Sequence, residues 1–338
     1  MLKSELIAEV QKIYPYYTRL ASMKKSELLY LYNKKCPDIP LIFNKNSCYM
    51  DSLFVALFIG DIDKKIYNLI VNNNSTNPNV IKIRTQLKQI YNVITGKTYK
   101  ETTCSRLRHN INSFFKEYQA ANPNAEETEW KRSQVDPTRL MEFLGIIFNT
   151  PYMVTERIST YGSLTKKIIS KDLITGANRK EKSTFIHTIS SDIIMGKKKI
   201  LLKNIFPNRK EIVHLDRDNL YNINGTMVST KIKKINVLSA PLIYINIDRL
   251  VVGMEKLDTV IVPFQKLKLI DNKLPLYLKS ILVHRGNAGG GHYVCVFECK
   301  DNWYLYDDLE SNIESIGKFQ DLLNRDDILE NSKAFIYA

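Results

Sequence analysis

Three short segments that lie far apart in the chain carry residues that could together perform nucleophilic catalysis. They are residues 46–53, 290–293 and 303–308, and they contain Cys48, His292 and Asp307. A cysteine attacks an acyl carbon as its thiolate, so it needs an imidazole to take its proton and benefits from a helix N-terminus. A carboxylate on the far side of the imidazole fixes the tautomer of the ring. The sequence therefore predicts Cys48 as nucleophile, His292 as general base and acid, and Asp307 as the residue that orients His292.

Each of these residues has an ordinary structural interpretation when it is taken alone. A single cysteine that begins an apolar helix is usually a core residue, and a single histidine before a strand usually has no catalytic role. The presence of all three groups in one chain is what favours catalysis.

The elements around these residues predict an α+β fold. Apolar residues at 50, 53, 54, 57 and 58 follow a helical period, which puts Cys48 in the first turn of a buried helix. Residues 80–150 continue with a mainly helical pattern. From about residue 151, β-branched and aromatic runs bounded by turn residues predict an antiparallel sheet. The active site should lie at the seam between the two halves.

The strand that begins near His292 must return for Asp307 to reach the imidazole. Asp307 follows His292 by 15 residues, which is enough chain for a two-stranded hairpin. We place the turn of this hairpin at Asn302.

Composition places the chain among folded globular proteins. It has 338 residues, of which 44% are hydrophobic and 25% charged. The first ten residues lack a secretory pattern, and no apolar run approaches the roughly 18 residues of a membrane span. Five scattered cysteines suit a reducing compartment better than a disulfide framework. We therefore expect an intracellular protein of the cytoplasm or nucleus.

The net charge of +14 would be compatible with binding to nucleic acid. The lysines are spread along the chain, however, and there is no arginine-rich arm. Residues 1–40 read as a small helical extension that packs on the remaining chain and could add a weak nucleic-acid contact. Charge alone therefore does not decide the function.

Two longer motifs surround the candidate residues. The first is Lys45-Asn46-Ser47-Cys48-Tyr49-Met50-Asp51-Ser52-Leu53-Phe54-Val55-Ala56-Leu57-Phe58. The second runs from Tyr277 through Val283-His284-Arg285-Gly286-Asn287-Ala288-Gly289-Gly290-Gly291-His292-Tyr293-Val294 to Trp303 and Asp307-Asp308. Together they resemble the cysteine and histidine boxes of the ubiquitin-specific proteases, a family of papain-like deubiquitinases. Weaker similarities extend the resemblance over about residues 41–320, and they include residues 238–250 and 262–264.

The resemblance implies a thiol protease that hydrolyses (iso)peptide bonds at the C-terminal glycine of ubiquitin. It implies a papain-like fold over residues 41–338, with a helical thumb (41–150), reduced fingers (151–235) and an antiparallel β palm (236–338). Asp308 matches an acidic position next to the triad and is a supporting candidate. No cofactor is implied, and the partners are ubiquitin or ubiquitinated proteins, with no membrane.

The same resemblance indicates which residues contact the substrate. Glu142 stands where an acid would pair with an arginine of the ubiquitin tail. Gly290, Gly291 and Tyr293 would line the channel for the slender diglycine end, where side chains would crowd the backbone. His284 could act as an alternative base, but its position in the loop favours a gating or structural role.

Three departures from the family pattern affect these expectations. The position of the oxyanion-stabilising Asn, five residues before Cys48, is Phe43. Asn44, with the Cys48 amide, is our choice for that role, and Asn46 is the alternative or only holds the loop. The position of a second acidic tail contact is Arg139, with Asp136 three residues upstream. The chain also has no Cys-x-x-Cys pair, so we expect fingers without structural zinc.

Other functions remain open from the sequence. The protease could act on a ubiquitin-like modifier or on a Gly-Gly polyprotein site. A non-catalytic ubiquitin-binding scaffold is a third possibility, although a scaffold has no physical need for Cys48, His292 and Asp307 together. The compact size and the Lys/Asn/Ile-rich composition would suit a viral member of the family or a protist.

Overall fold

The computed structural model describes most of the chain and all of the elements that carry the predicted site. The described residues are 1–13, 20–33, 41, 44, 46–61, 64–71, 74–97, 102–121, 136–148, 157–162, 186–206, 210–214, 220–223, 226–235, 241–250, 256–269, 274–287, 289–310 and 313–338. Among these residues, no helix is both long and apolar enough to cross a membrane.

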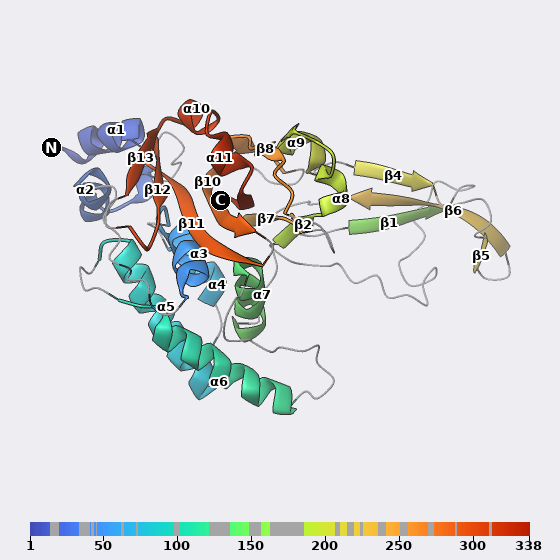
Figure 1. Ribbon diagram of the computed structural model, residues 1–338, viewed down its shortest axis with the longest axis horizontal. Coiled ribbons are helices and arrows are strands. Elements are labelled where there is room, and N and C mark those ends of the chain that lie inside the picture. The colour runs from blue at the N-terminus through green and yellow to red at the C-terminus, as the bar shows by residue number, and fades with distance from the viewer. Residues whose placement is uncertain are drawn as a thin grey trace.

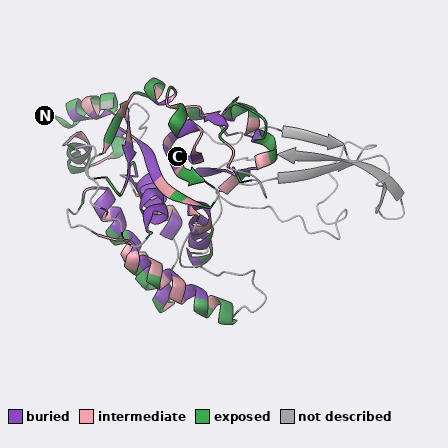
Figure 2. Ribbon diagram, in the orientation of Figure 1, coloured by how far each residue is buried: buried purple, intermediate pink, exposed green. Residues whose placement is uncertain are grey.

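A helical half surrounds one central, buried helix, α3 (Cys48–Phe58). All eleven residues of α3 are buried, so this helix is enclosed on every side (Figure 2). It contacts strands β10 and β11 on one side and neighbouring helices on the other. These helices are α4 (Lys65–Val71), α5 (Pro78–Ile94), which packs on α6 (Ser105–Ala121), and α7 (Pro137–Phe148).

The second half is a sheet that packs against α3 (Figure 1). The order of its strands is β13-β12-β11-β10-β14-β7-β2, with the short β9 paired to the start of β10. The bounds are β2 (Ile186–Ile189), β7 (Ile243–Ile247), β9 (Lys266–Leu267), β10 (Leu276–Asn287), β11 (Gly290–Cys299), β12 (Asn302–Tyr306), β13 (Glu314–Gly317) and β14 (Ser332–Tyr337). Short helices α10 (Phe319–Leu322) and α11 (Asp326–Leu329) connect β13 to β14.

The predicted α+β class is confirmed, but the expectation of a purely antiparallel sheet is wrong at one edge. Strand β2 runs parallel to β7, because the chain reaches β7 by a long crossover through other elements rather than by a hairpin. The crossover contains α8 (Ser191–Ile194), β3 (Lys199–Leu201) and α9 (Leu202–Ile205), and β3 also pairs parallel, with β8 (Val260–Val262).

The hairpin that carries His292 turns one position earlier than we expected. Strands β11 and β12 pair through Cys299 and Asn302, so the turn consists of Lys300 and Asp301. Both have positive φ, 53° and 60°, and a two-residue turn with two positive φ values matches the right-handed twist of a hairpin. Asn302 is therefore the first residue of the returning strand.

A separate four-stranded sheet lies far from α3, at the opposite end of the molecule from the N-terminus (Figure 1). It contains β1 (Arg157–Gly162), β4 (Lys210–His214), β5 (Leu220–Ile223) and β6 (Thr226–Ile235). Strand β6 pairs with each of the other three strands, always antiparallel. These strands fall in residues 151–235, the region expected to form reduced fingers.

The N-terminal helices form a small core of their own. These are α1 (Lys3–Ile13), the 3₁₀ turn η1 (Leu20–Ser22) and α2 (Lys25–Asn33). Their buried side chains Leu6, Val10, Leu20 and Leu28 make a hydrophobic cluster distinct from the main core.

A buried arginine links the eight-stranded sheet to neighbouring loop segments through hydrogen bonds. Arg249 is 3% exposed. Its guanidinium donates hydrogen bonds to the carbonyl oxygens of Leu257, Thr259, Leu329 and Ser332 and to the Ser332 hydroxyl, at 2.6–3.0 Å. Because every partner is neutral, this arginine acts through its fixed donor geometry rather than through a salt bridge.

The described cysteines are of two kinds. Cys48, Cys104 and Cys295 are free and buried, whereas Cys299 is disulfide-bonded.

Candidate active site

The first turn of α3 carries the predicted nucleophile, and a short hydrogen-bond network shapes the approach to it. The backbone N–H of Asn44 donates a hydrogen bond to Ser47 Oγ at 2.9 Å. The Ser47 hydroxyl in turn donates to Asp51 Oδ2. Ser47 is the residue before the helix, and its carbonyl accepts from the amides of Met50 and Asp51. The network thereby fixes the turn that delivers Cys48.

Burial dominates the electrostatics of the Cys48 thiol. Cys48 is 8% exposed, and this burial raises its pKa, while hydrogen bonds from the backbone of Tyr293 and Tyr49 lower it less. Our expectation that the helix N-terminus favours the thiolate is therefore outweighed by desolvation. The thiol is protonated at neutral pH unless a base accepts its proton.

Polar contacts with strands β10 and β11 hold α3 in place beside His292. The Ser52 hydroxyl, one helical turn after Cys48, donates to the Tyr293 carbonyl at 2.8 Å. The Ser280 hydroxyl of β10 donates to the Ala56 carbonyl at 2.7 Å. Because the Cys48 thiol interacts with the backbone of the same Tyr293, the thiol lies next to the residue that follows His292.

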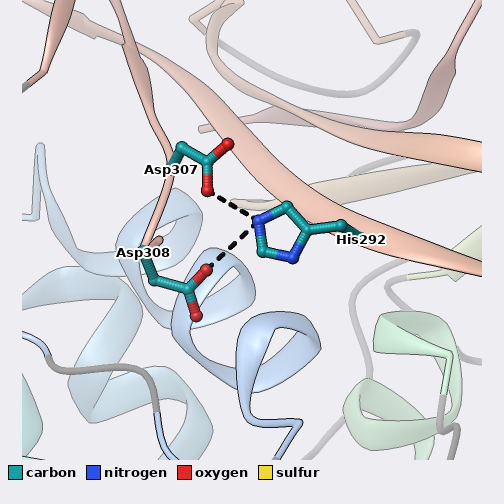
Figure 3. Close-up of side chains that lie close together, drawn as sticks. All are labelled: His292, Asp307 and Asp308. Atoms are coloured by element: carbon teal, nitrogen blue, oxygen red, sulfur yellow. Dashed lines mark hydrogen bonds and ion pairs between the residues drawn. The ribbon is translucent and has the colours of Figure 1, made fainter. Parts of the chain in front are cut away.

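His292 and Asp307 form a close pair (Figure 3). The Nε2 atom of His292 is 2.6 Å from Asp307 Oδ1, which also accepts a hydrogen bond from the Leu309 amide at 3.1 Å. Asp307 is 8% exposed and follows directly after β12. With Nε2–H donating to the carboxylate, Nδ1 is the ring nitrogen that can exchange a proton with a thiol.

Arg285 holds the other oxygen of the same carboxylate. Its Nη1 atom donates to Asp307 Oδ2 at 3.2 Å. Arg285 lies directly opposite His292 in the β10–β11 pairing. The Asp307 carboxylate is thus held on one oxygen by the imidazole and on the other by a guanidinium from the neighbouring strand.

Asp308 approaches the same imidazole nitrogen from the other side (Figure 3). Its Oδ1 atom lies 3.3 Å from His292 Nε2, and its side chain is fully buried. Burial and the nearby Asp51 raise the pKa of Asp308 to about 8. Asp308 is therefore mostly neutral at pH 7, whereas Asp307 is the carboxyl with hydrogen-bond donors on both oxygens.

The cluster of His292, Asp307 and Asp308 has three potential ligand atoms within 4.8 Å of one another. A metal at about 2.0–2.2 Å from each ligand would hold neighbouring ligand atoms about 3.3 Å apart in tetrahedral geometry. The Nε2–Oδ1 separation of 2.6 Å is too short for that arrangement and fits a hydrogen bond. The geometry thus favours proton transfer over metal binding.

Comparison with known proteins places this site in a family. The family model described as ubiquitin carboxyl-terminal hydrolase matches residues 41–337. The chain belongs to this family. Its members are thiol-dependent ubiquitinyl hydrolases, so the predicted deubiquitinase class is confirmed.

A solved structure supports the fold of this hydrolase. The chain is similar to a chain in the SAGA DUB module of Ubp8, Sgf11, Sus1 and Sgf73 bound to monoubiquitin, with a TM-score of 0.56 and 15% identity. The match covers 90% of this chain and 71% of that chain. No curated protein matches the sequence, and the comparisons give no support to a viral origin.

The other histidine of the hydrolase's histidine box has a packing role. His284 pairs across the strands with Tyr293, and their ring centroids are 4.7 Å apart. Burial, with Lys256 and Lys333 nearby, lowers the pKa of His284 to about 4. His284 is therefore neutral and packed against the Tyr293 ring at a tilt of 38°, which fits the structural role rather than that of an alternative base.

Gly291 is required by the hairpin itself. A Cβ atom at this position would lie 2.3 Å from the Arg285 carbonyl oxygen and 2.6 Å from His284 Nε2. At Gly289, by contrast, the nearest atom would be Asn287 Oδ1 at 3.5 Å. The absence of a side chain at Gly291 thus allows the close approach of β10 and β11. The sequence did not indicate this structural requirement for glycine.

The predicted tail contact, Glu142, already has a partner. Its Oε2 atom is 2.6 Å from Arg139 Nη1, and both side chains are 43% exposed. The Arg139 guanidinium also lies over the Phe143 ring, 4.9 Å from its centroid. The upstream acid, Asp136, is paired with Lys333 at 2.7 Å. Both acidic candidates for a tail arginine are thus occupied by basic residues of the chain.

The two asparagines before Cys48 differ in position. Asn44 is half-buried and belongs to the Ser47 network, whereas Asn46 is exposed and has a φ of 60°. Asparagine tolerates this left-handed conformation better than most residues, so Asn46 suits a role in holding the loop. Phe43 lies outside the described residues.

Sequence reasoning missed Arg285, Ser52 and Asp51. Arg285 lies within the histidine box. The pairing register of the two strands, which places Arg285 opposite His292, could have identified it as a partner of the triad. Ser52 follows Cys48 at the i,i+4 spacing of a helix, so its hydroxyl had to share the thiol's face. The proximity of Asp51 to Asp308 depends on tertiary packing alone.

We predict that Arg285→Ala lowers kcat/KM on a ubiquitin-derived substrate by about two- to fivefold, the size expected for a half-exposed ion pair. The acidic limb of the pH–rate profile should move to higher pH, because the positive charge that opposes protonation of the His292–Asp307 pair is removed. Arg285→Lys should keep that limb in place. Steady-state kinetics across pH measure both effects.

Arg325→Ala is the matched control, since this arginine pairs with Glu314 and Asp327 away from the site. A pH profile of Arg285→Ala that superimposes on the wild type would contradict a role in positioning Asp307.

Proposed function

We propose that this hydrolase cleaves (iso)peptide bonds at the C-terminal glycine of ubiquitin with Cys48, His292 and Asp307 as its triad. The observation that carries the proposal is the seam between α3 and β11. There the buried thiol interacts with the Tyr293 backbone, and the preceding His292 is paired with Asp307 at 2.6 Å.

The reaction follows from the protonation states of these groups. His292 Nδ1 takes the thiol proton as Cys48 Sγ attacks the glycine carbonyl, which gives a tetrahedral intermediate. The imidazolium then gives that proton to the leaving amine, and a thioester remains on Cys48. A water molecule that His292 deprotonates hydrolyses the thioester and releases the ubiquitin carboxylate. Asp307 keeps Nδ1 facing the thiol throughout.

The oxyanion of each tetrahedral intermediate needs hydrogen-bond donors. We propose the Cys48 amide, at the start of α3, together with the Asn44 carboxamide. The half-buried position of Asn44 supports this choice, as does the hydrogen bond from its backbone amide to Ser47, which fixes the Asn44 backbone before α3. We assign Asn46 to the loop.

The remaining features are proposed in line with family membership. Ubiquitin in the similar solved structure supports ubiquitin as the partner, with Gly290, Gly291 and Tyr293 along the tail and Glu142 beside it. We further propose a catalytic domain over residues 41–338, an extension over residues 1–40 with a weak nucleic-acid contact, and a location in the cytoplasm or nucleus.

Covalent capture tests the proposed nucleophile and substrate together. Wild-type protein should gain one ubiquitin mass from ubiquitin that carries a C-terminal thiol-reactive group. Cys48→Ala should abolish labelling, and His292→Ala should slow it strongly. Cys295→Ala is the control, because Cys295 is another free, buried thiol near the site. Intact-mass spectrometry gives the result.

Two outcomes would count against parts of the proposal. If ubiquitin fails to label the wild type while a small thiol reagent modifies Cys48, the substrate is a ubiquitin-like modifier or another Gly-Gly tail. If neither reagent modifies Cys48, the chain is a ubiquitin-binding scaffold rather than a hydrolase.

The pairing of Arg139 with Glu142 bears on the preference for the substrate tail. A tail arginine must displace Arg139 before it can pair with Glu142. We therefore expect Arg139→Ala to lower KM for a ubiquitin substrate by about two- to fivefold, the range of an exposed ion pair, with kcat unchanged. Arg139→Lys keeps the competing charge and should behave like the wild type. An unchanged or raised KM in Arg139→Ala would contradict this competition.

A further inference from the structure

A second pair of acids lies behind the triad, and the mechanism above does not use it. Asp51 is fully buried in the first turn of α3. The side chain of Asp308 is fully buried as well. The two carboxyl groups lie within hydrogen-bonding reach of each other.

The hydrogen bonds around this pair leave one proton to be accounted for. The Ser47 hydroxyl donates to Asp51 Oδ2. Asp51 Oδ1 and both carboxyl oxygens of Asp308 are buried and accept no hydrogen bond from another N–H or O–H group. The Cys104 thiol lies within hydrogen-bonding reach of Asp51. Two ionised carboxylates would therefore face each other as acceptors in a place that water does not reach, at a large cost in free energy. A single proton between them turns one acid into a donor and removes this conflict.

The titratable and charged groups that face the pair come from four parts of the fold. From the helical half they are Cys48 and Tyr49 of α3, Cys104 just before α6, and Arg108 within α6. From the sheet they are His292 of β11 and Tyr306 of β12. Arg108 carries the positive charge of this set and lies 5.7 Å from the centroid of the Tyr49 ring. One guanidinium balances one negative charge, which is the charge of an acid pair that keeps one proton.

We propose that Asp51 is a positioning residue that shares one proton with Asp308, and that loss of this proton sets the alkaline limit of catalysis by Cys48 and His292. The shared proton holds the Asp308 carboxyl toward Asp51, so that the strong hydrogen bond of His292 goes to Asp307. Loss of the proton puts a second negative charge behind the nucleophile. That charge disfavours the Cys48 thiolate and pushes Asp308 away from Asp51.

The pH–rate profile tests this proposal, and this part of the test rests on the proposed function. Asp51→Asn keeps the shape of the side chain and removes its acidic proton. We expect the alkaline limb of kcat/KM to move to higher pH by about one unit, as for removal of one member of a like-charged pair. Asp308→Asn should move the limb in the same direction. The double variant should move it no further, because both substitutions remove the same pair.

Asp61→Asn is the matched control. Asp61 is also a buried acid of the helical half, but its carboxylate accepts from the amides of Ile66 and Tyr67 at the start of α4. This substitution should lower stability without moving the alkaline limb. An alkaline limb in Asp51→Asn identical to that of the wild type would overturn the proposal.

Two readouts are independent of activity and separate failure of this inference from failure of the proposed function. The infrared carbonyl band of a protonated carboxylic acid should be present at neutral pH and absent in both Asp51→Asn and Asp308→Asn. The Tm should fall as pH rises from about 4, where an unfolded carboxyl ionises, to about 8, the pKa of Asp308, because over this range the unfolded chain has lost the proton that the folded state still holds. The fall should be smaller in Asp51→Asn. A wild-type protein without the carboxylic acid band would also overturn the proposal.

Discussion

The packing of α3 against β10 and β11 is the constraint on which the site depends. A helix buried on every side can carry a reactive thiol at its first residue only if its position is fixed. The hydrogen bonds from Ser52 to the Tyr293 carbonyl and from Ser280 to the Ala56 carbonyl fix it on the side of the sheet. The bond from Ser52 joins the helical half to the sheet one residue from His292. The distance between nucleophile and base is therefore set by the core of the protein rather than by a loop.

The same burial determines the chemistry. It excludes water from Cys48 and raises the pKa of the thiol, so a helix N-terminus alone does not activate it. Activation must come from a base that is held in one orientation. Two donors fix the Asp307 carboxylate for this purpose, the Leu309 amide on one oxygen and the Arg285 guanidinium on the other. A buried, protonated nucleophile is thus protected from reaction until the base acts on it.

The sequence predicted those parts of the site that local pattern specifies. Apolar spacing after Cys48 located α3 to its first residue, and alternating β-branched runs located the strands of the palm. The Lys300-Asp301 turn was misplaced by one residue because either position is polar and common in turns. The parallel pairing of β2 was missed because register between distant segments depends on tertiary contacts. Arg139 was recognised as a departure, but its ion pair with Glu142 required side-chain geometry, as did the proximity of Asp51 to Asp308.

The central claim is that His292, rather than the start of α3, generates the Cys48 thiolate. The most direct test is the rate at which a small alkylating reagent modifies Cys48 as a function of pH, followed by mass spectrometry in wild type and His292→Ala. We expect alkylation near neutral pH in the wild type and a shift of that reactivity to alkaline pH in His292→Ala. Identical profiles in the two proteins would contradict it, because the thiolate would then form without the imidazole.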